Sequence, residues 1–529
     1  MTATKPLGAQ ISHMLKDRGV DVIFGIPGVH NQELYRGIEE AGIRHVLARH
    51  EQGAGFMADG YARASGKPGV CYLITGPGLC NALTPLGQAY SDSVSVLAIA
   101  SCLDETSNYR GQLHQMLDQA GAAATVCDWS ETAATADAAY GLVDRALAEF
   151  NSQRKRPKAL SVPIQLLEGA AVAALPPITA PRLPLCGQGD VDRVVSLLDQ
   201  SVKPLFILGG GVADDATAEL LKTALPAMGA AAFMTYAGDG LVDPNYPLGF
   251  GTYLGRPGSA DVIAQSDLVI AIGTELAEVD LWRRELGHTG TLVRVDIDPQ
   301  VLSDIHRADV QVQGCGKDFL HRLSTQVITP ATGWSAGEVG QYKTAWRRET
   351  DMERPGIAAI CDVLRAALPD DAMIYSDMTQ FAYVAKEVWT MTRPGHWHHP
   401  TGFGTLGYAL PAAIGGAVAR PGKTTVAIAG DYGFQYTVQE LGTAVELGQP
   451  LPIIVWDNGK LKEIEDSMVH AQIAPNSVMA HNPDFCALAK AYGCGAVTPK
   501  TGAALTQSVK DAIAADKPTV IYLTADIQL

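Results

Sequence analysis

The feature of this sequence that most constrains its fold is the alternation of short apolar runs that end in glycine with longer helical stretches. Such runs include DVIFGIPG, GVCYLITGPG, SVLAIAS, PLFILGGG, DLVIAIGT, LVRVDIDP, TVAIAGDYG and LPIIVWDNG. Each run is apolar at successive positions, which is typical of parallel strands covered by helices on both faces. The rhythm therefore predicts an α/β fold of doubly wound parallel sheets.

Two breaks in composition divide the 529 residues. The segment from Ala171 to Gly189 contains four prolines and no periodicity, as an extended connector does. A second, polar break runs from about Thr329 to Gly356, around a helical stretch near Tyr342. The sequence therefore predicts three domains, at about 1–170, 190–330 and 355–529.

Charge and cysteine usage exclude several classes of partner. Forty Lys and Arg against 56 Asp and Glu give a net charge of −16, which repels nucleic acids and anionic membranes. The densest basic run, Arg154 to Lys158, is interpreted as a solvated domain edge. Nine cysteines without a C-x-x-C pair, no signal segment and no apolar stretch of about 18 residues predict reduced thiols and a cytoplasmic protein.

The most informative segment follows two neighbouring apolar runs near the C-terminus. Asp431 ends one run, Asn458 ends the next, and Gly433 precedes a helical stretch whose N–H groups could approach a phosphate. Carboxylate and amide oxygens at the ends of two parallel strands suit Mg²⁺. The alternative is that the dipeptides Gly-Asp and Asp-Asn are ordinary turns that close strands.

This segment resembles the cofactor motif of the thiamine diphosphate-dependent enzymes that include acetolactate synthases, pyruvate decarboxylases and benzoylformate decarboxylases. The resemblance implies that Asp431, Asn458 and the carbonyl of Lys460 hold Mg²⁺ and the cofactor diphosphate. Tyr432 and Asp457 depart from the motif's second Gly and first Asn, which leaves the loop conformation open. The adjoining residues expected to bind the cofactor are Gly430, Tyr432, Gly433 and Leu461.

A second segment, HEQGAGFMADGYAR, places Glu51 at the start of a helix rich in Gly and Ala. By itself, an acid at a helix N-terminus is simply favoured by the helix dipole. The resemblance implies instead that Glu51 is catalytic: it shares a proton with the aminopyrimidine of the cofactor, whose imino nitrogen then removes the thiazolium C2 proton. The small side chains of this helix would let another chain or a cofactor come close.

Residues 402–407, GFGTLG, have the spacing G-x-G-x-x-G of a dinucleotide site. That interpretation is rejected, because no apolar strand precedes them and no acid closes a second strand about 20 residues later. The resemblance implies that Gly404 contributes a carbonyl to the aminopyrimidine and that Leu406 forces the bent shape of the cofactor. It also implies diphosphate contacts from Thr379 and Gln380.

The turns GIPGVHNQEL and TGPG are those that usually border the pyrimidine and the substrate in this family. Where acetolactate synthases have Gly and a Phe-Gln-Glu segment, this chain has Val29, His30, Leu113, His114 and Gln115. His30 and His114 are therefore predicted to handle protons, with Gln115 beside them and Val29 at the substrate. Structural roles for both histidines remain an alternative.

The run LVIAIGTELAEVDLW resembles the central domain of the same family. The Arg- and Asp-rich turn of flavin-binding members is absent, which argues against FAD. An acidic set could instead pair with a guanidinium tail, although a solvated loop is the alternative. These tentative substrate residues are Glu275, Glu278, Asp280 and Glu463. GTELAEVDLW and GDYGFQYTVQEL look closest to decarboxylases of 2-ketoarginine.

The resemblance covers nearly the whole chain and implies a Mg²⁺- and thiamine diphosphate-dependent decarboxylase of a 2-oxo acid, with 5-guanidino-2-oxopentanoate as the candidate substrate. In the family, the glutamate and the diphosphate motif come from different subunits, so a homodimer is the minimum unit and a homotetramer is expected. Carboligation of the acetolactate synthase type is the enzymatic alternative. A non-catalytic regulatory or structural paralogue is the other, and the intact Glu51, Asp431 and Asn458 argue against it.

Overall fold

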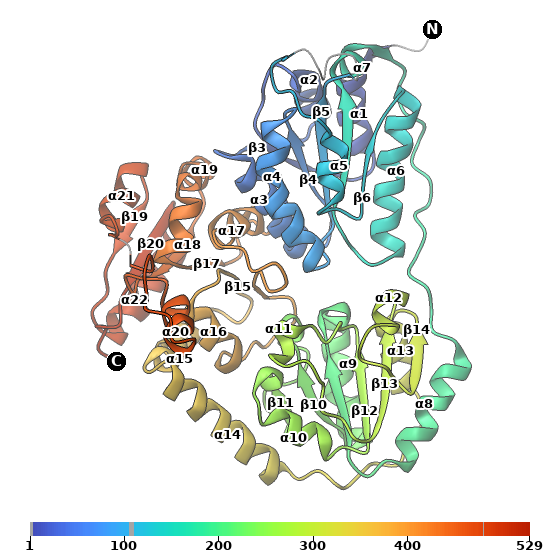
Figure 1. Ribbon diagram of the computed structural model, residues 1–529, viewed down its shortest axis with the longest axis vertical. Coiled ribbons are helices and arrows are strands. Elements are labelled where there is room, and N and C mark those ends of the chain that lie inside the picture. The colour runs from blue at the N-terminus through green and yellow to red at the C-terminus, as the bar shows by residue number, and fades with distance from the viewer. Residues whose placement is uncertain (1–3, 105–110, 480) are drawn as a thin grey trace.

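The computed structural model describes residues 4–104, 111–479 and 481–529. Its framework consists of three parallel sheets of six strands, each built from one continuous part of the chain (Figure 1). In Figure 1 the first domain lies at the upper right, the second at the lower right and the third at the left. All eight apolar runs named above form parallel strands, so the predicted α/β fold class is confirmed.

The first sheet has the strand order β3-β2-β4-β5-β7-β6. Its central strands are completely buried because helices pack on both faces. A two-stranded antiparallel pair, β1 (Lys5–Pro6) with β8 (Ala170–Ala171), ties the two ends of this domain together. The strands are β2 (Val22–Gly25), β3 (Arg44–Leu47), β4 (Gly69–Leu73), β5 (Val96–Cys102), β6 (Trp129–Thr132) and β7 (Lys158–Pro163). The helices are α1 (Leu7–Asp17), α2 (Gln32–Glu40), α3 (Glu51–Ser65), α4 (Pro77–Ser91), α5 (Gln119–Ala124), α6 (Ala136–Ser152) and α7 (Ile164–Glu168).

The second sheet has the order β11-β10-β9-β12-β13-β14. Strands β10 and β11 are added on one side of β9, whereas β12, β13 and β14 are added on the other side, and all of them are parallel. The strands are β9 (Pro204–Leu208), β10 (Ala231–Met234), β11 (Gly249–Gly251), β12 (Leu268–Ile272), β13 (Thr291–Asp296) and β14 (Val310–Gln313). The α-helices are α8 (Gln188–Gln200), α9 (Asp215–Met228), α10 (Ser259–Ala264), α11 (Glu278–Leu281), α12 (Pro299–Leu302) and α13 (Gly316–Ser324). Short 3₁₀ helices are η1 (Gly210–Val212), η2 (Tyr236–Gly238) and η3 (Tyr253–Gly255).

The third sheet has the order β16-β15-β17-β18-β20-β19. The long helix α14 (Ala336–Glu353) connects it to the second domain and extends the helical stretch expected near Tyr342 (Figure 1). The strands are β15 (Met373–Ser376), β16 (Trp397–His398), β17 (Thr425–Gly430), β18 (Leu451–Trp456), β19 (Gly495–Val497) and β20 (Pro518–Leu523). The helices are α15 (Ile357–Ala367), α16 (Gln380–Val388), α17 (Ala409–Ala419), α18 (Asp431–Tyr436), η4 (Val438–Glu440), α19 (Leu441–Leu447), α20 (Lys462–His470), α21 (Phe485–Tyr492) and α22 (Gly502–Ala514).

Helix α3 packs against α17 of the same chain, and glycines allow this close approach. A Cβ on Gly60 would overlap the carbonyl oxygen of Ala412, and a Cβ on Gly415 would overlap that of Met57. The hydroxyl of Tyr408 donates to Asp59 across the same contact at 2.8 Å. The Gly- and Ala-rich surface predicted on this helix therefore meets the third domain within one chain.

The interpretation of residues 154–158 as a solvated edge is wrong. Lys158 is fully buried in β7, where its ammonium pairs with Asp128 at 2.9 Å. Arg154 forms ion pairs with Glu275 and Asp298 of the second domain. The run is therefore an interdomain contact, and its acidic partners lie too far away in sequence for the local pattern to reveal them.

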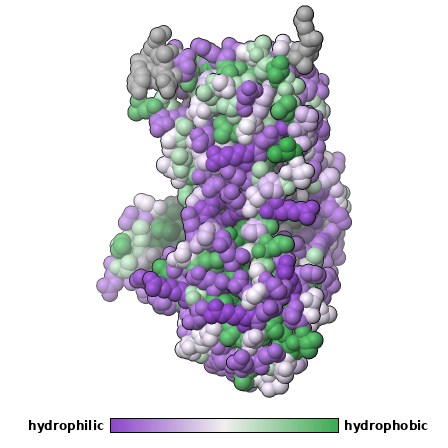
Figure 2. All heavy atoms as spheres, turned by 90° about the vertical axis from the view of Figure 1, so that its right-hand side faces the viewer, coloured by the Kyte–Doolittle hydropathy of each residue, from purple (hydrophilic) through white to green (hydrophobic). Residues whose placement is uncertain are grey.

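On one side of the molecule, polar and apolar side chains are mixed. Figure 2 shows hydrophilic and hydrophobic side chains interspersed over the face that the first and second domains present. Among the described residues, no helix is both long and apolar enough to cross a membrane.

Candidate active site

One group of predicted residues lies at the carboxyl ends of β2, β4 and β5. After β2, the N–H of Gly28 donates to Oδ1 of Asn31 at 2.7 Å. After β4, the N–H of Gly76 donates to Oε1 of Gln119 at 3.0 Å. Gly76 has a φ of +69°, and a Cβ there would overlap the carbonyl oxygen of His114. The first contact closes the turn after β2, and the other two join the turn after β4 to the segment after β5, at the edge where ligands bind in open α/β folds.

Glu51 is the first residue of α3 and points into this edge. Its Oε2 accepts a hydrogen bond from Nδ2 of Asn81 in α4 at 2.9 Å. Asn81 was not predicted from the sequence, because it belongs to no motif and only the packing of α3 on α4 brings it to Glu51. The carboxylate is half-buried and held by a neutral donor, so it can exchange a proton with a ligand.

The two predicted histidines lie side by side. The ring centroids of His30 and His114 are 4.7 Å apart, and the Nδ1 atom of each ring is buried with no hydrogen-bond partner among the residues that the structure describes. Burial lowers the pKa of His30, and the neighbouring His114 lowers it further. Gln115 is used locally, since its Oε1 accepts the N–H of Gly111 at 2.7 Å. Val29 is 64% exposed beside this pair.

A second group lies at the carboxyl ends of β15, β17 and β18 in the third domain. Asp431 directly follows β17, is 4% exposed, and its Oδ2 accepts Nδ2 of Asn482 at 2.7 Å. The same Nδ2 reaches Oδ1 of Asp457 at 3.0 Å, so Asn482 bridges the two strand ends. Burial raises the pKa of Asp431 to about 6, against the effect of the Asn482 hydrogen bond. The sequence gives no signal for Asn482.

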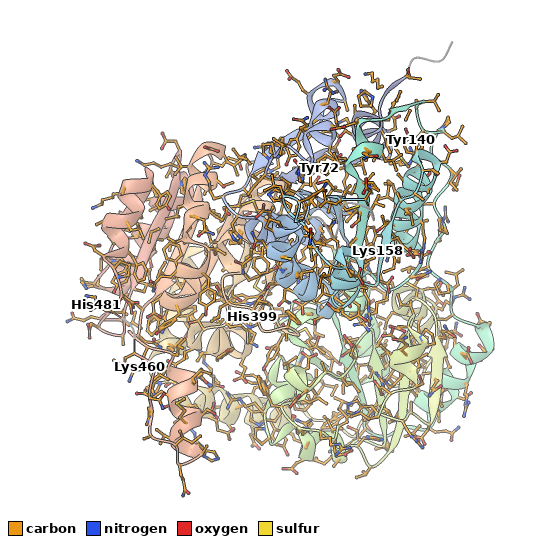
Figure 3. The ribbon with its side chains drawn as sticks, turned by 45° about the horizontal axis from the view of Figure 1, so that its top comes forward. Tyr72, Tyr140, Lys158, His399, Lys460 and His481 are labelled. Atoms are coloured by element: carbon orange, nitrogen blue, oxygen red, sulfur yellow. The ribbon has the colours of Figure 1, made fainter. Side chains whose placement is uncertain are left out.

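Asn458 lies on the adjacent strand end. Its Nδ2 donates to Oε1 of Gln380 at 3.1 Å, and its Oδ1 accepts the N–H of Lys460 at 3.3 Å. The ammonium of Lys460 turns toward Glu465 at 2.8 Å, while the N–H of Leu461 donates to a carbonyl of the loop that follows α20. Figure 3 shows Lys460 at the outer side of the third domain and His399 nearer the middle of the molecule.

The oxygen atoms of Asp431, Asn458 and Lys460 are suitable ligands for a hard divalent cation. Asp431 offers a second carboxylate oxygen, Asn458 an amide oxygen and Lys460 a carbonyl on neighbouring parallel strands. No cluster of three or more His, Cys, Asp or Glu side chains within the described ranges is arranged to hold a metal. A metal at this edge would therefore depend on amide and carbonyl oxygens, together with phosphate oxygens, as Mg²⁺ does.

Asp377, which the sequence analysis did not single out, connects the predicted cofactor loops. It is 1% exposed, and its Oδ2 accepts the N–H of Gly407 at 2.8 Å. A Cβ on Gly433 would lie 2.5 Å from the same oxygen, so only glycine fits there. Burial raises the pKa of Asp377 to about 7, against the backbone N–H groups that it accepts. Its position directly after β15, beside Thr379 and Gln380, was the available signal.

The remaining cofactor positions surround this centre. Gly404 has a φ of +66° and is exposed, whereas Leu406 and Tyr432 are half-buried. A Cβ on Gly430 would lie 3.1 Å from Oγ1 of Thr379, so these two predicted residues are in contact. The structure thus brings the loops at 377–380, 402–407 and 430–433 together.

The acids predicted for a cationic substrate are mostly paired within the chain. Glu463 accepts two N–H groups of Arg354, at 3.0 and 2.9 Å, and Glu275 pairs with Arg154. Burial raises the pKa of Asp280 to about 6, which the nearby Lys386 opposes. Glu278 is exposed at the start of α11.

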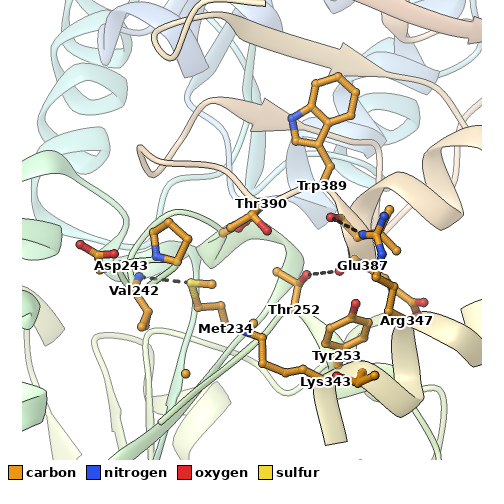
Figure 4. A pocket seen from close by; sticks show the side chains of 16 residues that line it. Met234, Val242, Asp243, Thr252, Tyr253, Lys343, Arg347, Glu387, Trp389 and Thr390 are labelled. Carbon is orange, nitrogen blue, oxygen red and sulfur yellow. Dashed lines mark hydrogen bonds between the residues drawn. The ribbon is translucent and has the colours of Figure 1, made fainter. Parts of the chain in front are cut away.

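A pocket of about 270 Å³ lies between the second and third domains, at the carboxyl ends of β10 and β11 (Figure 4). Met234, Thr252, Arg347 and Trp389 line it, and none of the predicted site residues does. The two groups described above are connected through the C-terminal end of α4, where Asp92 accepts the N–H of Gly402 at 2.9 Å and Gln88 accepts the hydroxyl of Thr405 at 3.1 Å. Across the described part of the chain, no hydrogen bond joins Glu51 to the third domain.

Comparisons with known proteins find related sequences over most of the chain. Three models of the thiamine pyrophosphate enzyme family match: the N-terminal TPP binding domain at residues 6–122, the central domain at 191–323 and the C-terminal TPP binding domain at 377–523. The chain is 41% identical to "Probable 2-ketoarginine decarboxylase AruI" of Pseudomonas aeruginosa, covering 94% of this chain and 90% of that protein. It is 30% identical to the acetolactate synthase isozyme 2 large subunit of Escherichia coli, covering 92% and 89%.

Proposed function

Since the chain belongs to the thiamine pyrophosphate enzyme family, we propose that it is a Mg²⁺-dependent decarboxylase that converts a 2-oxo acid into an aldehyde and carbon dioxide. The observation that carries this proposal is the 41% identity, over nearly the whole of both chains, to a probable 2-oxo acid decarboxylase. The intact oxygen donors Asp431 and Asn458 at adjacent strand ends support it.

Each group of residues has a separate role in this proposal. Bound thiamine diphosphate supplies the electron sink for the bond that breaks when carbon dioxide leaves. Asp431, Asn458 and the carbonyl of Lys460 would hold Mg²⁺, and Thr379, Gln380 and the N–H of Gly433 would bind the diphosphate. These contacts neutralise the diphosphate without a basic patch.

The first-domain group handles protons. Glu51, oriented by Asn81, would hold and return a proton for the aminopyrimidine of the bound cofactor. His30 and His114, with their unpartnered Nδ1 atoms, deliver or accept protons at the substrate. Because burial lowers the pKa of His30, its ring is mainly neutral at pH 7 and can accept a proton.

Turnover of a panel of 2-oxo acids, scored for carbon dioxide and aldehyde, tests the activity. We expect activity only with both thiamine diphosphate and Mg²⁺, and loss of it on chelation. Glu51→Gln should abolish turnover, whereas Glu39→Gln, on an exposed position of α2, should not change it. Unchanged turnover in Glu51→Gln would show that the assigned chemistry is wrong.

The substrate that we propose is 5-guanidino-2-oxopentanoate, as the name of the P. aeruginosa relative suggests. A guanidinium tail would have to displace Arg154 from Glu275 or Arg354 from Glu463. Glu278, which is exposed, is therefore the first of the four acids to test. The kcat/KM for this substrate should exceed that for a neutral 2-oxo acid of equal length, and Glu278→Gln should narrow the difference. Equal kcat/KM values for the two substrates would refute the proposal that the substrate is cationic.

Acetolactate synthesis is a second candidate function, favoured by the 30% identity to an acetolactate synthase subunit. Incubation with pyruvate distinguishes the two. Acetaldehyde as the main product supports decarboxylation, and acetolactate as the main product supports carboligation.

We also propose that active sites form between subunits of a homodimer, which can pair into a homotetramer. The hydrogen bonds of Glu51, Asp431 and Asn458 support this, since among the described residues none of them joins Glu51 to Asp431 or Asn458 of the same chain. Mixing inactive Glu51→Gln and Asp431→Ala chains should restore about a quarter of the activity, since half of the dimers are mixed and each has one intact site. No recovery after subunit exchange would argue for sites within single chains.

All nine cysteines are free, which suits the cytoplasmic location that we propose.

A further inference from the structure

Glu440 is a buried acid that belongs to neither group of site residues. It ends η4 in the third domain and is completely inaccessible to solvent. Its Oε1 accepts the N–H groups of Arg49 and His50, both at 3.0 Å, and its Oε2 accepts the hydroxyl of Thr443 at 2.8 Å. A carboxylate of the third domain therefore holds the first-domain backbone immediately before Glu51.

These contacts are made to the backbone at the point where α3 begins. His50 is the N-cap of α3, and its Nδ1 accepts the N–H of Gln52 at 3.2 Å. The N–H groups of Arg49 and His50 precede the helix and are satisfied by Glu440. Buried N–H groups without an acceptor are costly, so this carboxylate restrains where the first turn of the helix lies.

The surrounding packing is adapted to the carboxylate. A Cβ on Gly53 would overlap Oε1 of Glu440, so glycine in the first turn of α3 leaves room for it. The guanidinium of Arg49 forms its ion pair with Glu446, while its charge also acts to lower the pKa of Glu440. Burial raises the pKa of Glu440 to about 7, against the hydrogen bonds from Thr443 and the backbone. A polar group this deeply buried is retained where its geometry is used.

Asp431 and Glu440 lie in the same short segment of the chain. Asp431 begins α18, and the chain passes directly through η4 to Glu440. One continuous stretch of the third domain thus contains both Asp431, the proposed metal ligand, and Glu440, which binds the backbone at the start of α3. Neither the cofactor motif nor the glutamate motif includes Glu440.

We propose that Glu440 is a positioning residue for Glu51: by fixing the backbone of Arg49 and His50, it sets the position from which the Glu51 carboxylate exchanges its proton. The inference rests on the catalytic role proposed for Glu51. Glu440 touches neither substrate nor cofactor in this assignment and acts only through the start of α3.

The test combines an exchange measurement on the cofactor-free protein with steady-state kinetics of the loaded enzyme. Glu440→Gln keeps the size of the side chain but replaces one acceptor oxygen by a donor. We expect amide hydrogen exchange in residues 48–53 to become at least about 10-fold faster. We expect kcat to fall roughly 10- to 100-fold with KM changed less than about 2-fold, because a small misplacement of a reacting group has an effect of that size.

Two further variants keep the result interpretable. Glu446→Gln removes the partner of the Arg49 side chain and leaves the backbone hydrogen bonds intact, so exchange and kcat should match the wild type. Gly53→Ala displaces the Glu440 carboxylate by adding a methyl group on α3, so it should reproduce both effects of Glu440→Gln. It therefore tests the inference even if Glu440→Gln folds poorly.

Unchanged exchange in Glu440→Gln, or faster exchange with the kcat of Glu446→Gln, would overturn the inference. Glu51→Gln separates it from the proposed function. Full turnover by Glu51→Gln would overturn both, whereas an inactive Glu51→Gln beside a fully active Glu440→Gln would overturn this inference alone.

Discussion

The contact between α3 and α17 yields the sharpest stability prediction, through Gly60→Ala. In the interior of a solvated helix, Gly→Ala stabilises by about 1 kcal/mol, because alanine loses less conformational entropy on folding. At Gly60 the added methyl would overlap the carbonyl oxygen of Ala412, a backbone atom on the facing helix. Overpacking of this kind costs about 1–3 kcal/mol, and here the two helices themselves must separate.

A matched control lies in α14. Gly340 is also inside a helix, but no atom lies within 4 Å of the position of its Cβ. Gly340→Ala should therefore stabilise by about 1 kcal/mol. Gly60→Ala should destabilise by up to about 2 kcal/mol, which places the two variants roughly 1–3 kcal/mol apart.

Differential scanning calorimetry measures this difference. For a cooperative unit of 150–250 residues, about 1 kcal/mol shifts Tm by roughly 2–4 °C. The transition that includes the first domain should move down in Gly60→Ala, while the transition that includes α14 moves up in Gly340→Ala. If Gly60→Ala raised Tm as Gly340→Ala does, the close packing of α3 on α17 would be refuted.

Three further predictions concern buried charged groups. Asp377→Asn should raise the Kd of thiamine diphosphate about 10-fold in titration calorimetry, because the N–H of Gly407 loses a charged acceptor; an unchanged Kd would contradict its role. Burial raises the pKa of Asp239 from 3.8 to about 8, so its contribution to stability falls by about 1.4 kcal/mol per pH unit between these values and is lost as pH rises through 8. The Tm of Asp239→Asn relative to wild type should accordingly increase from pH 5 to pH 8, and a constant difference would disprove the shift. Lys158→Met should destabilise by about 2 kcal/mol, since Asp128 loses its ammonium partner and Glu149 keeps only Arg145, whereas Lys155→Met on the exposed position nearby should have little effect on Tm; equal effects would contradict the buried ion pair.

Much of the framework could be predicted from sequence because it depends on local patterns. A strand covered on both faces must be apolar at every position, and β4 and β5 are recognisable for that reason. The ends of such strands meet at one edge, so Asp431 and Asn458 could be assigned to a sheet edge from their places after apolar runs, whereas Glu51 was assigned to the start of a helix. The glycine at position 60 likewise signalled a close neighbour, although not which one.

Other parts of the site depend on contacts between distant segments, and no local pattern encodes them. Asn81 reaches Glu51 only because α4 packs beside α3, and Asn482 joins two strand ends from a later loop. Glu440 holds a backbone about 390 residues earlier in the chain, which no spacing rule could indicate. Sequence alone thus determined the fold class and the family resemblance, and it placed Asp431 and Asn458 at a sheet edge. The tertiary structure decided which acids are already paired and which orient the catalytic groups, because a charge is neutralised by its neighbours in space.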